Sequence, residues 1–392
     1  MLFENNSKPR KKSYYPFSKN YPTKSGNSYD IGESRARHKR EERNKVIFYI
    51  SLIVLFVLVF IASSVAITLS RRSITDVNAG KASEYMGKLK AYHMPDEALS
   101  GGIAYSLFKT ELSNAKANAV MIDFKTADGL LHFNCSYETA VSIGATSSAY
   151  ENANEIITAL KNDGYKIIAN IYCFEDSLAA SMLSGAEVTQ AGTGAVWLDN
   201  TAQKDGNPRL NPYSQTACDY LLNVMAKSVE CGADVVLLSS VSFPDSPTAA
   251  DAYFEGEEGS VQSRNAVLHE FVSNAAAVCG NVPVAVYLSA DSALNGNGTL
   301  YSGGMFDSDA LFNAVDFRSA AIKESITIGG ESFSKEDINE NACISKAVPL
   351  LKEKLEENYT TKDIIPVIDD EIYLPTLENL QVENYIIIKS DT

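Results

Sequence analysis

The chain has 392 residues, of which 45% are hydrophobic and 21% are charged, and its net charge is −15. This length leaves room for one large globular domain together with non-globular segments. The acidic balance disfavours binding to nucleic acids and other polyanions, which repel a negatively charged protein.

Residues 1–45 form a polar segment with 12 Lys/Arg against 5 Asp/Glu and no apolar periodicity. A segment of this composition cannot bury enough apolar surface to fold, so we expect a disordered tail. Its basic cluster "RARHKREERNK" would lie against anionic lipid at a membrane surface. A docking motif for a cytoplasmic partner is the alternative interpretation of this tail.

Residues 46–70 contain no charged side chain. As a helix they would extend roughly 37 Å, at about 1.5 Å per residue, which is enough to cross a hydrocarbon core of about 30 Å. A secretory signal peptide has a shorter apolar region, so a transmembrane signal-anchor is the preferred interpretation. The excess of Lys and Arg before it predicts a single-pass protein of the cell membrane with a cytoplasmic N-terminus.

Residues 71–392 would then lie outside the cytoplasm, with a net charge of −22 from 22 Lys/Arg and 44 Asp/Glu. After an expected juxtamembrane linker at 71–97, residues 98–392 repeat one unit, which is an amphipathic helix, a glycine and a short apolar strand. Three glycines are expected to end helices of this repeat in the left-handed conformation, namely Gly164, Gly232 and Gly280.

Eight segments are predicted to be strands, because each is short, apolar and rich in Val, Ile, Leu or Tyr. They are "GGIAYSL" (101–107), "AVMIDFK" (119–125), "KIIANIYCF" (166–174), "DVVLLSSVSF" (234–243), "VPVAVYLSA" (282–290), "NAVDFRSAA" (313–321), "IIPVIDD" (364–370) and "NYIIIKS" (384–390). Strands this continuously apolar are covered on both faces, as in a parallel sheet.

The expected fold class is therefore α/β, a closed (β/α)8 barrel of the TIM type. No helix is predicted after the last strand, and residues 80–98 are expected to help cover the barrel instead. A doubly wound open sheet is the alternative architecture. It has less support, because no GxGxxG motif follows the first strand.

Polar side chains follow most of the predicted strands, at the end where barrels of this type carry their sites. They are Asp123, Lys125, Asp128, Glu175, Asp176, Ser239, Ser240, Ser242, Tyr287, Asp291, Asp316, Arg318, Asp369, Asp370 and Glu371. Two carboxyl groups on one rim, about 5 Å or about 6.5–9.5 Å apart, are what glycoside hydrolysis requires. A single carboxylate can equally be a solvated or capping group, but Asp123 is distinguished by its place inside an apolar run.

The six cysteines are widely separated, and the four histidines do not cluster with them. Free buried thiols are therefore expected, rather than a disulfide framework or a metal site. No metal and no cofactor is predicted.

Several segments resemble one family. "NAVMIDFKTADG" (118–129), "ALKNDGYKIIANIYCFEDS" (159–177), "WLDN" (197–200) and "RLNPYSQTACDY" (209–220) are similar, in order and spacing, to the "putative glycosyl hydrolase" domain of bacterial envelope proteins. The similarity covers roughly residues 98–390. It implies an amylase-like (β/α)8 barrel and a carbohydrate ligand.

The resemblance also assigns positions. Asp123, Lys125, Asp128 and Gly129 match the motif of the second strand, and Asp176 matches the third, where Asn170 replaces the usual Arg. Trp197 matches an aromatic residue near the mouth, where it would stack on a sugar or simply pack in the core.

The fourth strand departs from the family pattern. Its Asp, Tyr and Arg positions fall on Ser239, Ser240 and Ser242, although Phe243 and Pro244 match. The resemblance implies that the missing Asp is the nucleophile, and a serine without a histidine base cannot stabilise an oxocarbenium centre. The departure predicts that the inherited hydrolytic mechanism is absent.

Three hypotheses follow. The first is a membrane-anchored, catalytically impaired barrel that binds a cell-envelope carbohydrate through Lys125, Asp128, Asn170, Asp176, Trp197, Ser239, Ser240, Tyr287 and Arg318. The second is an active hydrolase that uses Asp123 together with Asp369 or Asp370. The third is a non-catalytic scaffold protein of the envelope, with the cytoplasmic tail and the outer domain as docking surfaces.

Overall fold

The structure of the protein is a computed structural model, and it describes residues 39–40, 43–52, 88–257, 261–296, 310, 312–322, 324–358 and 363–389. The chain divides into two compact units, residues 1–71 and residues 72–392. Each unit is considered by itself.

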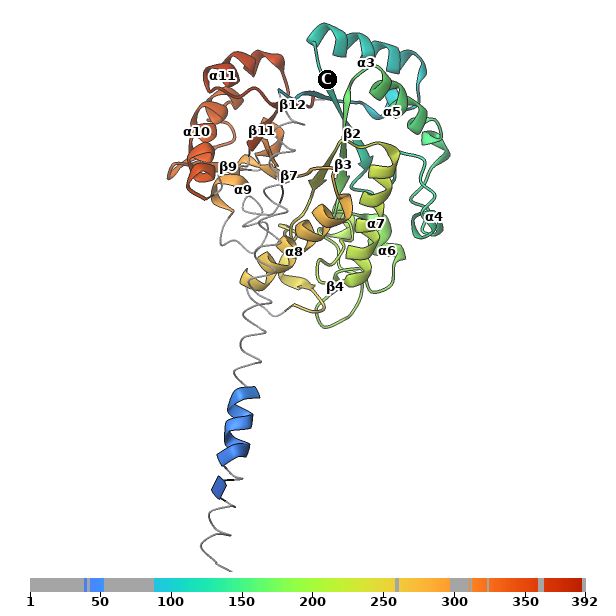
Figure 1. The fold of residues 1–392 in the computed structure, drawn as a ribbon. Helices are drawn as coiled ribbons and strands as arrows, with labels where there is room; N and C mark the ends of the chain where they lie inside the picture. Colours follow the sequence, from blue (N-terminus) through green and yellow to red (C-terminus); the bar gives the residue numbers. More distant parts are fainter. Residues whose placement is uncertain are drawn as a thin grey trace, which may run out of the picture. The chain divides into compact units, whose positions relative to one another are not determined.

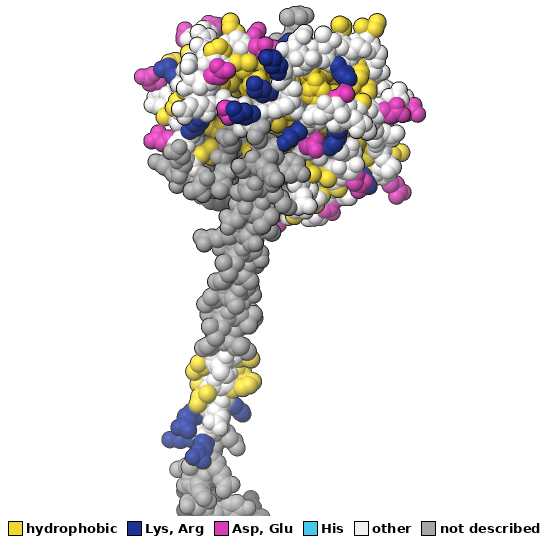
Figure 2. Space-filling view, turned by 45° about the horizontal axis from the view of Figure 1, so that its top comes forward, with side chains coloured by type: hydrophobic (Ala, Val, Ile, Leu, Met, Phe, Trp, Pro, Cys, Tyr) yellow, Lys and Arg dark blue, Asp and Glu magenta, His cyan; other side chains and the backbone are white. Residues whose placement is uncertain are grey.

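In the first unit, residues 43–52 are helical. The hydrophobic side chains of this helix between Val46 and Leu52 are exposed, and Figure 2 shows them next to a group of Lys and Arg side chains. Most of the predicted span at 46–70 lies outside the described residues, as do nearly all of the predicted tail and the linker up to residue 87. Among the described residues, no helix combines the length and the apolar character needed to cross a membrane.

The second unit is built on a closed barrel of eight parallel strands, as the sequence predicts (Figure 1). Around the barrel the strands run in the order β1 (Lys90–His93), β12 (Tyr385–Ile387), β11 (Asp363–Ile368), β8 (Phe312–Asp316), β7 (Val284–Ser289), β5 (Val235–Ser239), β3 (Lys166–Tyr172) and β2 (Ala119–Lys125). Seven of the eight predicted strands are confirmed.

Helices connect the strands and surround the barrel. They are α2 (Asp96–Leu99), α3 (Gly102–Ala115), α4 (Glu138–Ser142), α5 (Ala153–Asn162), α6 (Ser177–Met182), α7 (Gln215–Cys231), α8 (Val261–Cys279), α9 (Ala290–Asn295), α10 (Glu340–Asn358) and α11 (Leu374–Asn379). Two small antiparallel pairs are added in the loops, β4 (Thr189–Gln190) with β6 (Ala252–Tyr253) and β9 (Ser325–Ile328) with β10 (Glu331–Ser334).

The predicted first strand at 101–107 is wrong. These residues belong to α3, and the first strand of the barrel is β1, inside the segment predicted as a linker. The apolar run suggested a buried strand, but two of its apolar residues, Ile103 and Leu107, are 81% and 66% exposed on α3. The buried face of α3 is formed by Phe108 and Leu112, which lie after the run. Residues 90–93 therefore form part of the barrel wall and do not merely cover it.

All three glycines expected to end helices, Gly164, Gly232 and Gly280, have the left-handed backbone conformation. Gly232 caps α7 with φ 111°, and its N–H bonds to the carbonyl oxygen of Ser228. Gly164 has φ 92° and follows Asp163, the C-cap of α5, and Gly280 has φ 61° directly after α8. Left-handed conformations of this kind are open to glycine at little cost, so these helix ends are confirmed as predicted.

The barrel interior is filled by the alternate side chains of the strands. One apolar cluster occupies this space and includes Ala91, Met121, Ile168, Leu237, Ala285, Ala314, Val367 and Ile386. A second, larger apolar cluster lies between the strands and the surrounding helices. The interior is thus a packed core, and any ligand site must lie at an end or on the wall of the barrel.

All six cysteines lie in described segments, and all are free thiols. Cys135, Cys173, Cys279 and Cys343 are buried, and Cys218 and Cys231 are partly buried. Burial raises the pKa of the Cys218 and Cys279 thiols to about 12, which keeps them protonated and unreactive.

Candidate functional site at the carboxyl ends of the strands

A layer of polar side chains closes the apolar interior at the carboxyl ends of the strands. Because inward-facing residues alternate along a strand, the positions two residues after the apolar layer also face inward. The polar residues at those positions are His93, Asp123, Asn170, Ser239, Tyr287, Asp316 and Asp369, and the eighth position, after β12, is Ile388. Six of these seven were singled out from the sequence, and only His93 was not.

One half of this layer is a chain of hydrogen bonds across four strands. His93 Nε2 lies 3.0 Å from Asp123 Oδ2, and Asn170 Nδ2 donates to Asp123 Oδ1 at 2.6 Å. Ser239 Oγ in turn donates to Asn170 Oδ1 at 2.6 Å. The hydrogen bond from Ser239 therefore orients the Asn170 amide so that its NH2 group donates to Asp123.

The Asp123 carboxylate stays ionised in this setting. Burial raises its pKa, but the hydrogen bond and charge of His93 and the Asn170 amide outweigh burial, so that the pKa lies below its usual range. A register shift in the pairing of β2 with β3 occurs between Asp123 and Lys125. Such bulges re-aim side chains and are frequent next to functional sites.

The other half of the layer contains an ion pair. Arg318 donates to Asp316 Oδ1 through Nε at 3.0 Å and to Asp316 Oδ2 through Nη2 at 2.8 Å, and the Tyr287 hydroxyl also donates to Asp316. The Asp316 side chain is 3% exposed and that of Arg318 is 18% exposed. Arg318 is thus the member of the ion pair that a ligand can reach.

Glu340, at the start of α10, was missed in the sequence. Its Oε1 accepts a hydrogen bond from the backbone N–H of Asp369 at 3.3 Å, and the residue is 2% exposed. Burial, together with the negative charge of Asp369, raises the pKa of Glu340 to about 8. The site therefore holds one carboxyl group with a raised pKa close to other carboxyl groups, the pattern that separates acid and base roles in many enzymes.

Lys125 and Asp176 form a buried ion pair. Lys125 Nζ lies 2.8 Å from Asp176 Oδ2, and both side chains are 0% exposed. Lys125 also donates to the backbone oxygen of Tyr172, and Asp176 caps α6 by accepting from the N–H of Ala179. Neither side chain is exposed to a ligand. Lys125 and Asp176, which were predicted to contact the substrate, therefore have a structural role in this structure.

Gly129 packs closely against the Asp176 side chain of this ion pair. A Cβ atom there would collide with the Asp176 carboxylate and lie 2.7 Å from Leu178 Cβ, and the backbone has φ 96°. The "DFKTADG" motif of the resemblance is thus explained largely by the packing of one turn against α6, while Asp123 alone reaches the mouth.

Three other predicted residues lie outside the polar layer. Trp197 is 2% exposed, and its indole nitrogen donates to the Thr248 carbonyl oxygen at 3.0 Å, so its ring is packed and not open to stacking on a sugar. Asp128 is exposed in a turn, where it accepts from the Thr126 hydroxyl. Asp370 is exposed and caps a 3-10 turn through the N–H of Ile372.

A cleft of about 950 Å³ opens beside the layer. Ser240 follows β5 directly and has a backbone φ of 54°. Its hydroxyl donates a hydrogen bond to Glu175 Oε2 at 2.7 Å. Arg209 pairs with the same carboxylate at 3.1 Å. Residues from four loops line the cleft, among them Glu175, Arg209, Ser242, Phe243, Pro244, Asp245, Pro247, Ser289, Asp291, Asn295, Ile322 and Glu324.

Tyr172, at the end of β3, lies close enough to both Asp123 and Glu175 to interact with their charges. Burial first, and then the charges of Asp123 and Glu175, raise the pKa of Tyr172 to about 12. Its hydroxyl therefore remains a hydrogen-bond donor at neutral pH. Within the described residues, no group of three or more His, Cys, Asp or Glu side chains is placed to hold a metal ion.

The fold and this polar mouth define the protein as a (β/α)8 barrel with a candidate site at the carboxyl ends of its strands. Residues 106–293 match the model of the family described as "Putative glycosyl hydrolase domain", and this match confirms the resemblance predicted from the sequence. The match ends before β8, so Asp316, Arg318 and Asp369 lie beyond it.

Solved structures with similar folds are distant in sequence. A hypothetical protein from Ruminiclostridium thermocellum is 20% identical over 50% of this chain and 96% of its own, with a TM-score of 0.44. The glycoside hydrolase domain of PelA from Pseudomonas aeruginosa is 10% identical over 77% and 94%, with a TM-score of 0.41. A dextranase from Flavobacterium johnsoniae is 9% identical over 77% and 36%, with a TM-score of 0.47. No curated protein matches the chain.

Proposed function

We propose that the barrel binds a carbohydrate of the cell envelope at its carboxyl-terminal mouth and no longer hydrolyses glycosidic bonds. The observation that carries this proposal is the state of the serines that follow β5. Ser239 and Ser240 both donate their hydroxyl protons, to Asn170 and Glu175 respectively. Neither can replace the carboxylate that the family pattern places there.

The remaining groups suit binding. Asp123 is an ionised acceptor, Tyr172 a permanent donor and Arg318 a partly exposed cation, so the mouth offers partners for hydroxyl groups of both polarities. The cleft beside them is large enough for a short oligosaccharide.

An active hydrolase with relocated carboxylates is the second candidate. The protonated Glu340 next to Asp369 favours it, because a raised pKa is what a general acid needs. Against it, Glu340 is 2% exposed and cannot reach a glycosidic oxygen without a movement of α10 or the β11 end.

We further propose that residues 46–70 hold the protein in the cell membrane as a single-pass anchor, with the N-terminus in the cytoplasm and the barrel outside. The exposed hydrophobic side chains of the helix at 43–52, directly after a basic segment, support this arrangement. Binding of the tail to a cytoplasmic partner remains a separate proposal.

The test uses the full-length protein with purified envelope polysaccharide and with maltohexaose and chitohexaose as defined probes. We expect binding without release of reducing ends. Asp123→Ala should weaken binding about tenfold or more, because a hydrogen bond to a charged group contributes about 1.5–3 kcal/mol. Asp163→Ala, in an exposed ion pair with Lys109, serves as the control and should leave affinity unchanged.

Release of reducing ends that is lost in Asp123→Ala or in Glu340→Gln would transfer support to the second candidate. Absence of binding to all three probes would favour the scaffold hypothesis instead.

A further inference from the structure

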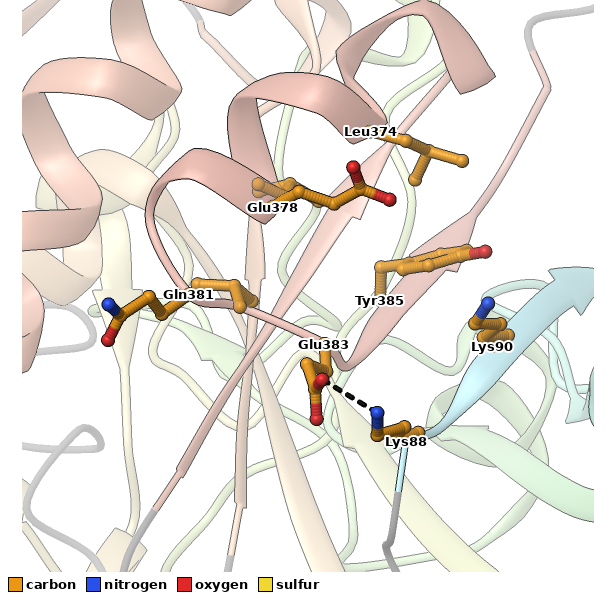
Figure 3. Close-up of a pocket in the computed structure, with 9 residues that line it drawn as sticks. Lys88, Lys90, Leu374, Glu378, Gln381, Glu383 and Tyr385 are labelled. Carbon is orange, nitrogen blue, oxygen red and sulfur yellow. Dashed lines mark ion pairs between the residues drawn. The ribbon is translucent and has the colours of Figure 1, made fainter.

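A second pocket lies on the outer wall of the barrel, near the amino ends of β1 and β12 (Figure 3). Lys90 and Tyr385 are register partners on these adjacent strands. Their neighbours Ala91 and Ile386 face the barrel interior, so Lys90 and Tyr385 face outward. With α11 and the turn that follows it, they enclose a pocket of about 640 Å³.

The pocket contains two charges of opposite sign that remain available. Lys88 is paired with Glu383 at 2.8 Å, but Lys90 and Glu378 form no ion pair or hydrogen bond through their side chains with any other described residue. In Figure 3 the ring of Tyr385 lies between the Glu378 carboxylate and the Lys90 ammonium group. A ligand across the ring could therefore meet both charges.

The Tyr385 hydroxyl is a third available group. The residue is only 6% exposed, yet among the described residues its hydroxyl has no hydrogen-bond partner. The hydroxyl is therefore available to donate to a ligand atom in the pocket. Leu374, Leu377 and Val382 supply an apolar surface beside it.

We propose that this pocket binds an α-amino acid or short peptide with a free amino group, a free carboxylate and an apolar side chain. The carboxylate pairs with Lys90 and accepts from Tyr385, the ammonium group pairs with Glu378, and the side chain packs on the leucines of α11. A zwitterion matches both charges at once, whereas a neutral polyol would leave both unmatched and an anion would leave Glu378 unmatched.

The pocket is independent of the carbohydrate site. Asp123 and its partners lie at the carboxyl ends of the strands, and Lys90 and Tyr385 lie at the amino ends. Mutations at one end can therefore be used as controls for the other.

The test is calorimetric titration of the full-length protein with leucine, leucyl-leucine, leucinamide and N-acetylleucine. Leucine or leucyl-leucine should bind. Leucinamide, which lacks the carboxylate, and N-acetylleucine, which lacks the ammonium group, should bind at least about tenfold more weakly, because each loses a charge-assisted contact.

Two variants assign the contacts. Lys90→Gln should abolish the preference for leucine over leucinamide, and Glu378→Gln should abolish the preference for leucine over N-acetylleucine. Lys109→Gln, a change at a residue that does not line the pocket, should bind leucine as the natural chain does. Circular dichroism checks that each variant is folded.

Failure of both leucine and leucyl-leucine to bind overturns the proposal. So does binding of all four probes with equal affinity, or binding that is unchanged in both pocket variants. None of these results bears on binding of oligosaccharides at the mouth.

Discussion

Replacement of Lys125 by Met is expected to lower the free energy of unfolding by about 3–5 kcal/mol. The substitution keeps the length and apolar stem of the side chain but removes the cation. Asp176 is then left as a buried carboxylate with 0% exposure, and its remaining partner is the N–H of Ala179. Uncompensated buried charge is among the few causes of such large losses. Urea denaturation followed by circular dichroism measures the effect.

The matched control is Lys109→Met, which removes a cation from an ion pair at the surface. Lys109 Nζ lies 2.6 Å from Asp163, but the two side chains are 39% and 41% exposed. Pairs of this kind contribute about 0–1 kcal/mol. Equal losses in the two variants would show that Lys125 has no special role, and a Lys125→Met/Asp176→Leu double variant should recover most of the stability, because it buries no charge.

The motif around Asp123 shows what a sequence pattern can and cannot reveal. The pattern identified a group of residues with specific demands, and the structure divides that group in two. Asp123 faces the mouth, whereas Lys125, Gly129 and Asp176 secure a turn against α6. The spacing of the residues is the same for both roles, and only burial distinguishes them.

Seven strands of the barrel could be predicted, because strands covered on both faces are continuous apolar runs. β1 could not. It has only four residues, "KAYH", with a partly exposed Lys90 at its start and the site residue His93 at its end. Pairing with β2 and β12 forms this strand, since its own sequence contains little apolar signal. The apolar run at 101–107 was the stronger local signal, and it belongs to α3.

Most of the polar layer could be predicted from the alternation of side chains along the strands. Side chains alternate along each strand, so the residue that follows the apolar layer by two positions must face the mouth. This rule finds Asp123, Ser239 and Asp369 from the sequence. It cannot find Glu340, which begins a helix after the hairpin β9–β10 and reaches Asp369 only through the tertiary fold.

Glu340 should make the stability of the barrel depend on pH. Burial and Asp369 raise its pKa from about 4.5 to about 8, so between these values the folded state binds more protons than the unfolded state. Stability contributed by the protonated form is full below about pH 4.5 and decreases as the pH rises towards about 8. At one pKa unit per about 1.4 kcal/mol, the total decrease is about 3–5 kcal/mol.

Glu340→Gln should remove most of this dependence, because the amide keeps an oxygen acceptor for the Asp369 N–H and cannot ionise. We expect the variant and the natural chain to be about equally stable at pH 4.5, and the variant to be about 3 kcal/mol more stable at pH 9. Urea denaturation at both pH values measures the difference. Glu353→Gln, an exposed change on the same helix, should show no such divergence. If the difference in stability between Glu340→Gln and the natural chain is the same at pH 4.5 and at pH 9, the pKa of Glu340 is not raised in the folded protein, and its side chain is ionised at neutral pH. Its pairing with Asp369 then cannot supply the proton that the second candidate function needs.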